Sequence, residues 1–154
     1  MATPNFQPIF IRTPLLGIAT LTSEVIGRGG TNTLPPDNTL LVTAGSTGAF
    51  IENIEAIPVA DGTAITQSVL RIFRKKADDS ALVMCCPELS LPAIASSPAN
   101  VGLVALTVPL YPVIIGPSGT LGLRVGPNES IYCALGTTLT TGAYNVVATG
   151  GFYS

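Results

Sequence analysis

The 154-residue chain contains no histidine and no tryptophan, and charged residues make up only 10% of it. Without histidine, the commonest general base and the commonest metal ligand are both missing, as is every Ser–His or Cys–His nucleophilic pair. Seven basic residues against nine acidic ones give a net charge of −2, which disfavours nucleic-acid binding. We therefore expect a protein that is not an enzyme, uses no cofactor or metal, and does not bind nucleic acid.

The chain also lacks the sequence features of a secreted or membrane protein. Its start has no basic segment followed by an apolar one, so no secretory signal is predicted. The longest uncharged stretch, 89–123, is interrupted by five prolines, and its cleanest apolar part, 101–108, is 8 residues long. A spanning helix needs about 20 apolar residues, so we expect no membrane partner.

Cysteine is scarce, with Cys85, Cys86 and Cys133 as the three examples. An odd count with two adjacent residues makes a poor disulfide framework, and the spacing matches no zinc pattern. Successive side chains on a strand point to opposite faces, so we do not expect Cys85 and Cys86 to share a ligand. The pattern predicts small apolar side chains that fill a core in a reducing compartment.

The chain does contain many short apolar segments separated by glycine- and proline-rich turns. The expected strands are 16–22, 39–44, 49–59, 65–74, 80–86, 101–108, 111–115, 120–125, 130–135 and 143–149. No window shows a capped helical stripe. Short strands at spacings near ten residues predict an all-β protein, an antiparallel β-sandwich with a jelly-roll-like arrangement.

One of these segments, 49–59, has a helix-like spacing, because Ile51, Ile54 and Ile57 are three residues apart. Two glutamates lie between the isoleucines, and Pro58 follows at once. The segment is also rich in β-branched residues, so we predict a strand with a bulge that switches its faces.

The N-terminal residues 1–14 contain Pro4, Pro8 and Pro14, which exclude a regular helix and favour an extended backbone. Such a segment is either an arm that lies in a groove of a partner or the first strand of the same domain. We predict an arm over 1–14 and a sandwich domain over 15–154. The arm residues assigned to partner binding are Phe6, Ile9, Phe10, Ile11 and Arg12.

A basic cluster is the second candidate for partner binding. Arg71, Arg74, Lys75 and Lys76 place four of the seven basic residues within six positions. They could dock on an acidic partner, although the aspartates at 78–79 weaken their net field.

The expected core consists of the apolar residues of the predicted strands. These are Leu41, Ile54, Leu70, Ile72, Val83, Val104, Leu106, Leu123, Ile131, Cys133 and Val146.

From Leu41 onward the chain resembles a family of small β-sandwich proteins of tailed bacteriophages and prophages. The resemblance is carried by Val-Thr-Ala-Gly-Ser-Thr-Gly at 42–48, Ile-Glu-Asn-Ile-Glu-Ala at 51–56, Val-Leu-Arg-Ile-Phe at 69–73, Leu-Arg-Val at 123–125 and Asn-Val-Val-Ala-Thr-Gly-Gly-Phe-Tyr at 145–153. These motifs are structural rather than catalytic. The chain departs from the family pattern in its proline-rich middle, 86–117, and in its N-terminal arm.

The resemblance implies a head decoration (cement) protein. Such a subunit is made in the host cytoplasm, binds the outer capsid surface of the virion, and contacts the major capsid protein and its own copies, often as a homotrimer. The low charge content suits a surface that neighbours cover. The alternative is a receptor- or carbohydrate-binding module of a phage fibre or spike, although the Phe and Tyr residues are scattered and tryptophan is absent.

Overall fold

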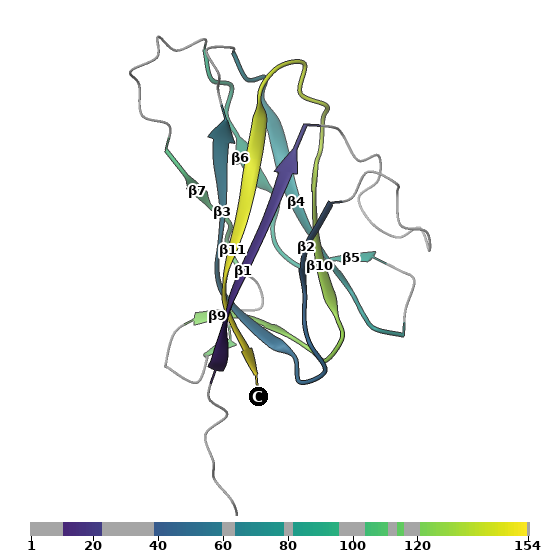
Figure 1. The fold of residues 1–154 in the computed structure, drawn as a ribbon. Coiled ribbons are helices and arrows are strands. Elements are labelled where there is room, and N and C mark those ends of the chain that lie inside the picture. The colour runs from purple at the N-terminus through teal and green to yellow at the C-terminus, as the bar shows by residue number, and fades with distance from the viewer. Residues whose placement is uncertain are drawn as a thin grey trace, which may run out of the picture.

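The computed structural model describes residues 11–22, 39–59, 64–78, 82–95, 104–110, 114–115 and 121–153. They form two antiparallel sheets packed against each other, so the predicted all-β sandwich is confirmed (Figure 1). The jelly-roll-like arrangement stays a prediction. The strands of this part of the chain are β1 (Ile11–Leu21), β2 (Thr39–Thr43), β3 (Ala49–Val59), β4 (Ser68–Lys75), β5 (Leu82–Met84), β6 (Leu89–Leu91), β7 (Leu106–Thr107), β8 (Ile114–Ile115), β9 (Leu121–Val125), β10 (Ser130–Leu135) and β11 (Ala143–Tyr153).

The six-stranded sheet has the order β1-β11-β3-β9-β8, with β7 paired to β3. Its first three strands are each 11 residues long. The residues of β1 alternate: Leu15, Gly17, Ala19 and Leu21 face the core, while Leu16, Ile18 and Thr20 face outward. Strand length and alternation together give this sheet a continuous buried face.

The predicted bulge in 49–59 is confirmed. Asn53 lies opposite Thr149 and Ile51 lies opposite Gly150, so Glu52 is the extra residue on β3. The bulge turns both Ile51 and Ile54 toward the core, although they are three residues apart. A Cβ added at Gly150 would lie 2.0 Å from the Phe50 carbonyl oxygen, so the partner strand needs glycine here.

The five-stranded sheet has the order β2-β10-β4-β5, with β6 also paired to β4. Its strands are shorter, from 3 residues in β5 and β6 to 8 in β4. On β4, Leu70 and Ile72 face the core, opposite Leu135 and Cys133 of β10 in the register of the sheet.

The strand predictions differ from the structure mainly in length. The segment 130–135 coincides with β10, whereas β11 runs past the predicted end at 149 to Tyr153. Within the described residues, the segments 80–86, 101–108 and 111–115 contribute only β5, β7 and β8. Residues 80–81, 101–103 and 111–113 of these predicted strands lie outside the described residues.

The N-terminal boundary also differs. β1 begins at Ile11, where it pairs with Tyr153, and Pro14 lies opposite Gly151. Residues 11–14, which we assigned to the arm, are thus paired with β11 in the sandwich. Proline is tolerated because β1 is the terminal strand of its sheet. Residues 1–10 of the predicted arm lie outside the described residues.

The core lies between the two sheets and contains most of the side chains predicted for it. Leu41, Ile54, Leu70, Ile72, Leu123, Ile131, Cys133 and Val146 are buried, and Leu106 packs against them while partly exposed. Val83 and Val104 are 60% and 76% exposed, so their prediction is wrong. Val83 lies on the short edge strand β5 and Val104 lies just before β7 at the margin of its sheet, where none of the described strands covers them.

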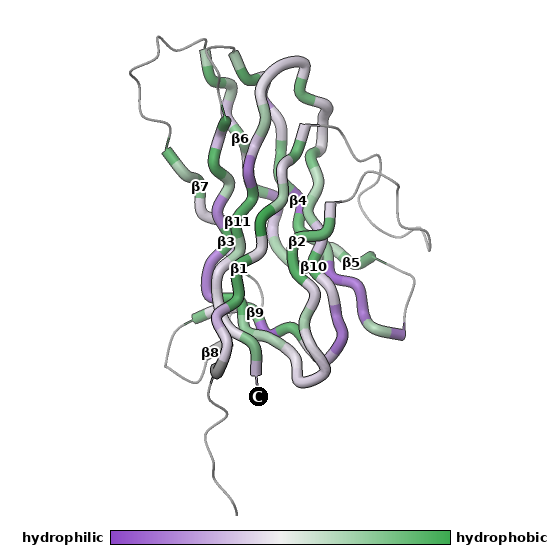
Figure 2. The backbone as a smooth tube through the Cα atoms, in the orientation of Figure 1, coloured by the Kyte–Doolittle hydropathy of each residue, from purple (hydrophilic) through white to green (hydrophobic). Residues whose placement is uncertain are grey.

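Hydrophilic residues are confined to a few places on the described backbone. Figure 2 shows hydrophilic stretches in the turn that follows β4 and on parts of β3 and β11, while most of the strand tube is pale or hydrophobic. Among the described residues there is no helix with the length and apolar character that crossing a membrane requires.

Candidate functional surface

The arm residues predicted to bind a partner are only partly within the described structure. Phe6, Ile9 and Phe10 lie outside the described residues. Ile11 and Arg12 form the first residues of β1, and the register with β11 is irregular between Ile11 and Thr13. The backbone of β1 is therefore paired with β11 from Ile11 onward, and Arg12 lies at the irregularity.

The four basic residues predicted as one cluster are separated by strand alternation. Arg71 and Lys75 lie on the outer face of the five-stranded sheet, and Arg74 lies on the inner face with Ile72. Lys76 follows the end of β4 and is exposed. The structure therefore does not gather the four side chains into one patch.

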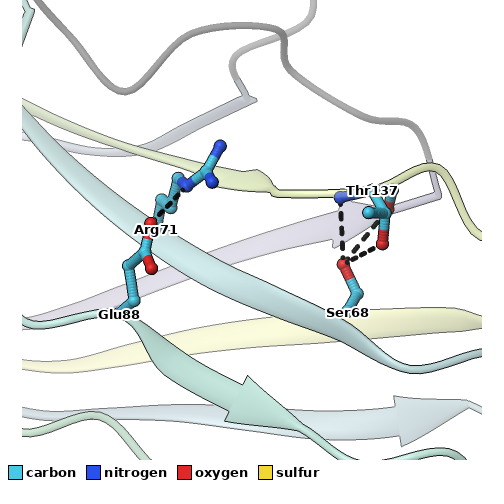
Figure 3. Close-up of polar contacts among 4 residues, drawn as sticks. All are labelled: Ser68, Arg71, Glu88 and Thr137. Carbon is cyan, nitrogen blue, oxygen red and sulfur yellow. Dashed lines mark hydrogen bonds and ion pairs between the residues drawn. The ribbon is translucent and has the colours of Figure 1, made fainter.

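Arg71 is nearly buried and is paired within the chain. Its Nε donates to Oε1 of Glu88 over 2.8 Å, and the two side chains are 11% and 33% exposed (Figure 3). Glu88 lies between β5 and β6, so the pair connects this segment to β4. A buried charge needs such a partner, which accounts for Arg71 without an external ligand.

Arg74 is paired with Glu129, which lies in the turn between β9 and β10. Glu129 Oε2 accepts hydrogen bonds from Arg74 Nη2 and from the backbone N–H of Gly126, the latter over 2.6 Å. The same turn contains Asn128 with φ of 55°, a left-handed conformation that asparagine tolerates. The carboxylate thus holds its own turn and links it to β4.

A third polar contact fixes the start of β4. The N–H of Thr137 donates to Ser68 Oγ over 3.2 Å, and Ser68 Oγ–H donates to the Thr137 carbonyl over 3.1 Å (Figure 3). Ser68 is buried, so these bonds satisfy its hydroxyl. They join the segment after β10 to the first residue of β4.

The outer face of the five-stranded sheet carries a row of apolar and aromatic side chains. Leu40, Tyr132, Phe73 and Met84 lie opposite one another on β2, β10, β4 and β5, and we call them the outer row. Leu40 and Met84 are exposed, Tyr132 is half-buried, and Phe73 is buried against its neighbours. Aromatic residues and methionine are enriched at protein-binding surfaces.

The outer face of the six-stranded sheet carries a second apolar surface. Leu16 and Ile18 of β1 are 66% and 60% exposed, and Val147 lies opposite Ile18 on β11; we call these three residues the β1 patch. The sequence analysis missed this patch. The alternation of 15–21 was visible, but both sets of alternating residues contain apolar side chains, so the sequence did not indicate which set faces outward.

The adjacent cysteines differ from their prediction. Cys85 and Cys86 lie beyond the end of β5 at Met84, where the chain bends before Pro87, and their Sγ atoms are 3.9 Å apart. Strand alternation therefore does not separate them. The hydrogen bond with Cys86, followed by burial, raises the pKa of Cys85.

Cys133 lies apart from this pair on β10. Its Sγ–H donates to the Thr39 carbonyl over 3.6 Å, and burial raises its pKa to about 12. A buried, protonated thiol of this kind behaves as a small apolar core residue, which agrees with its predicted place in the core.

These contacts divide the surface into two kinds of region. The ion pairs and the Ser68–Thr137 contact are internal ties of the sandwich, whereas the outer row and the β1 patch present apolar side chains to the outside. Such surfaces suit docking against other protein surfaces. No family model matches the chain, and no curated protein sequence matches it.

Proposed function

We propose that the protein is a structural virion component, a decoration (cement) subunit that binds the outside of a phage head. It acts by binding alone, without a catalysed reaction, and its partners are its own copies and the major capsid protein. The observation that carries the proposal is that both outer faces of the sandwich expose apolar side chains, in the β1 patch and in the outer row.

The physical reason is the free energy of burial. A fully buried leucine or isoleucine contributes about 1.5–3 kcal/mol of transfer free energy relative to an exposed one. Leu16 and Ile18 gain less than half of this in the isolated sandwich, because 66% and 60% of their surface faces solvent. A neighbour that covers the patch supplies the missing burial, and a chain with only 10% charged residues pays little to dehydrate the surrounding surface.

We assign the β1 patch to contacts between copies in a homotrimer and residues 1–10 to contacts with the capsid. Residues 1–10 precede Ile11 in the sequence and include Phe6, Ile9 and Phe10. Binding to the assembled shell then stabilises it by mass action, since rupture of the shell must also break the contacts of the cement subunit.

The first experiment measures copy number. Quantitative mass spectrometry of purified virions should find this chain in copies comparable to the major capsid protein. A receptor- or carbohydrate-binding module of a fibre or spike would be present in far fewer copies, and that result would reject the cement function.

The second experiment tests the β1 patch. The double variant Leu16→Thr/Ile18→Thr should keep its fold, because threonine suits an exposed strand position. Light scattering should show trimers for the unmodified protein and monomers for the variant. Leu121→Thr is the matched control, since Leu121 is 60% exposed on β9, away from β1 in the same sheet, and it should remain trimeric.

The third experiment tests residues 1–10. Deleting them leaves the ladder between β1 and β11 intact, because the pairing begins at Ile11. We expect unchanged thermal unfolding together with loss of attachment to particles that lack the subunit. A truncated protein that decorates such particles at full occupancy would reject the role of this segment.

A further inference from the structure

The pair Cys85 and Cys86 forms a site that the proposed function does not use. Their Sγ atoms are 3.9 Å apart at the end of β5, on a segment whose backbone is held by the hydrogen bond from Cys85 N–H to the Ile72 carbonyl over 3.0 Å. The Cys85 thiol also donates to the same carbonyl over 3.6 Å. Two thiols on a fixed segment, converging rather than diverging, are a chelating pair.

The geometry favours a bridging atom over a direct sulfur–sulfur bond. A disulfide requires about 2.05 Å between the sulfurs and normally a Cα separation of about 4.4–6.8 Å, whereas adjacent residues have Cα atoms about 3.8 Å apart. Two metal–sulfur bonds of about 2.3 Å each reach sulfurs up to about 4.6 Å apart. The observed 3.9 Å falls within the span of one bridging centre.

The surroundings select the class of that centre. Among the described residues, no third cysteine, aspartate or glutamate completes a set of metal ligands, and the chain contains no histidine. Ions that require four ligands or oxygen donors therefore do not fit, and soft centres that accept two thiolates do. Cys86 is buried and Cys85 is partly buried, so a product without net charge is favoured over a charged one.

We propose that Cys85 and Cys86 are a vicinal dithiol site for a soft, thiophilic acceptor that two thiolates neutralise, such as a monosubstituted trivalent arsenic centre. With phenylarsine oxide, two As–S bonds form, the As–O bond breaks, and the two thiol protons leave with the oxygen as one water molecule. No oxidation or reduction takes place. Cys85, the more exposed thiol, reacts first, and Cys86 closes the ring.

The test uses phenylarsine oxide with the folded, full-length protein. Intact-mass spectrometry should show one adduct per chain, with two of the three thiols no longer titratable, and a small dithiol should release the adduct where a monothiol does not. Cys85→Ser and Cys86→Ser should each raise the half-saturating concentration at least about tenfold, because chelation is lost. The matched control Cys133→Ser removes the thiol that lies alone on β10 and should bind as the unmodified protein does.

Three results would overturn the site: an adduct that forms only after denaturation, unchanged binding by Cys85→Ser, or loss of binding in Cys133→Ser. Circular dichroism of each variant establishes that it is folded. If Cys86→Ser does not fold, Cys85→Ser decides the outcome by itself, because Cys85 is only partly buried and its replacement by serine disturbs the core least.

Discussion

The two sheets of the sandwich are held together in different ways. In the six-stranded sheet, β1, β11 and β3 are long and share nearly continuous ladders. In the five-stranded sheet the strands are shorter, and side chains tie their ends to neighbouring turns through Arg71–Glu88, Arg74–Glu129 and Ser68–Thr137. Both ion pairs found among the described residues involve β4 of the five-stranded sheet.

The comparison shows where a protein with few charges places them. A long ladder satisfies most backbone groups by itself, so side-chain contacts such as the hydrogen bond from Thr20 Oγ1 on β1 to Asn145 Oδ1 on β11, over 2.7 Å, only add to it. A short strand leaves its ends and its adjoining turns to be fixed by other groups. In this chain Arg71 and Arg74 do this through their ion pairs, which is why they do not form the binding cluster that their spacing suggested.

The largest expected effect comes from the core that both sheets share. Ile54→Ala on β3 removes a fully buried side chain and should lower the free energy of unfolding by about 2–5 kcal/mol. Ile72→Ala on β4 should cost a similar amount, because the core does not distinguish the sheets. Guanidinium unfolding of both variants measures this, and a loss below about 1 kcal/mol in only one of them would show that the sheets unfold separately.

The next effect tests how closely the edges of the two sheets meet. A Cβ added at Gly17 of β1 would lie 2.3 Å from the Leu41 carbonyl oxygen on β2. Gly17→Ala must therefore move one backbone away from the other and should cost about 1–3 kcal/mol. The matched control Gly45→Ala adds a methyl group where no atom lies within 4 Å, and it should change stability by at most about 0.5 kcal/mol. Equal effects in thermal unfolding would contradict the close contact.

A smaller effect tests the side-chain ties of the five-stranded sheet. Glu129→Gln removes the charge that faces Arg74 and should cost on the order of 1–2 kcal/mol. This loss of stability is small for a buried ion pair, because the Arg74 side chain is 31% exposed and solvent screens its attraction to Glu129. A double-mutant cycle with Arg74→Met isolates the coupling, and Lys76→Met, at an exposed position, is the neutral control. A coupling near zero would remove the distinction between the two sheets.

In both sheets, local features were more predictable from the sequence than features that depend on distant parts of the chain. The bulge in 49–59 and the extent of β10 followed from local patterns, since turn residues and β-branched runs act over a few neighbours. The exposure of Val83 and Val104 did not follow, because it depends on whether another layer lies above the strand. The pairing of Arg74 with Glu129, 55 residues apart, was equally invisible in the sequence.

The last test concerns pH and asks whether the centre of the five-stranded sheet is as well buried as that of its partner. Burial raises the pKa of Cys133 from 9.0 to about 12. A raised pKa contributes stability that is complete below pH 9 and is lost as the pH rises from 9 toward 12, approaching about 1.4 kcal/mol per pH unit. Burial raises the pKa values of Tyr144 and Tyr153 as well, which adds to the loss in alkali.

Cys133→Ala removes one of these titrations. We expect the variant to be less stable than the unmodified protein at pH 7 but to lose less stability between pH 8 and pH 10.5, measured by denaturant unfolding at each pH. Parallel curves for the two proteins would mean that the Cys133 thiol reaches solvent in the folded state.

The sequence by itself determined the class of the fold. Short β-branched segments, frequent turn residues and the absence of capped helical stripes leave an antiparallel sandwich as the way to bury so many apolar residues with so few charges. These are local preferences, and each acts over a few residues of the chain.

Only the tertiary structure decided which apolar and polar side chains are used inside and which are left outside. It placed Leu16 and Ile18 on the open face of β1, turned Arg71 and Arg74 to glutamates of the same chain, and brought the thiols of Cys85 and Cys86 together. Each outcome depends on strand register and on where a strand ends. Both are set by pairing with segments far away in the sequence. A shift of one residue in that pairing would exchange the two faces of the strand and with them the buried and exposed side chains.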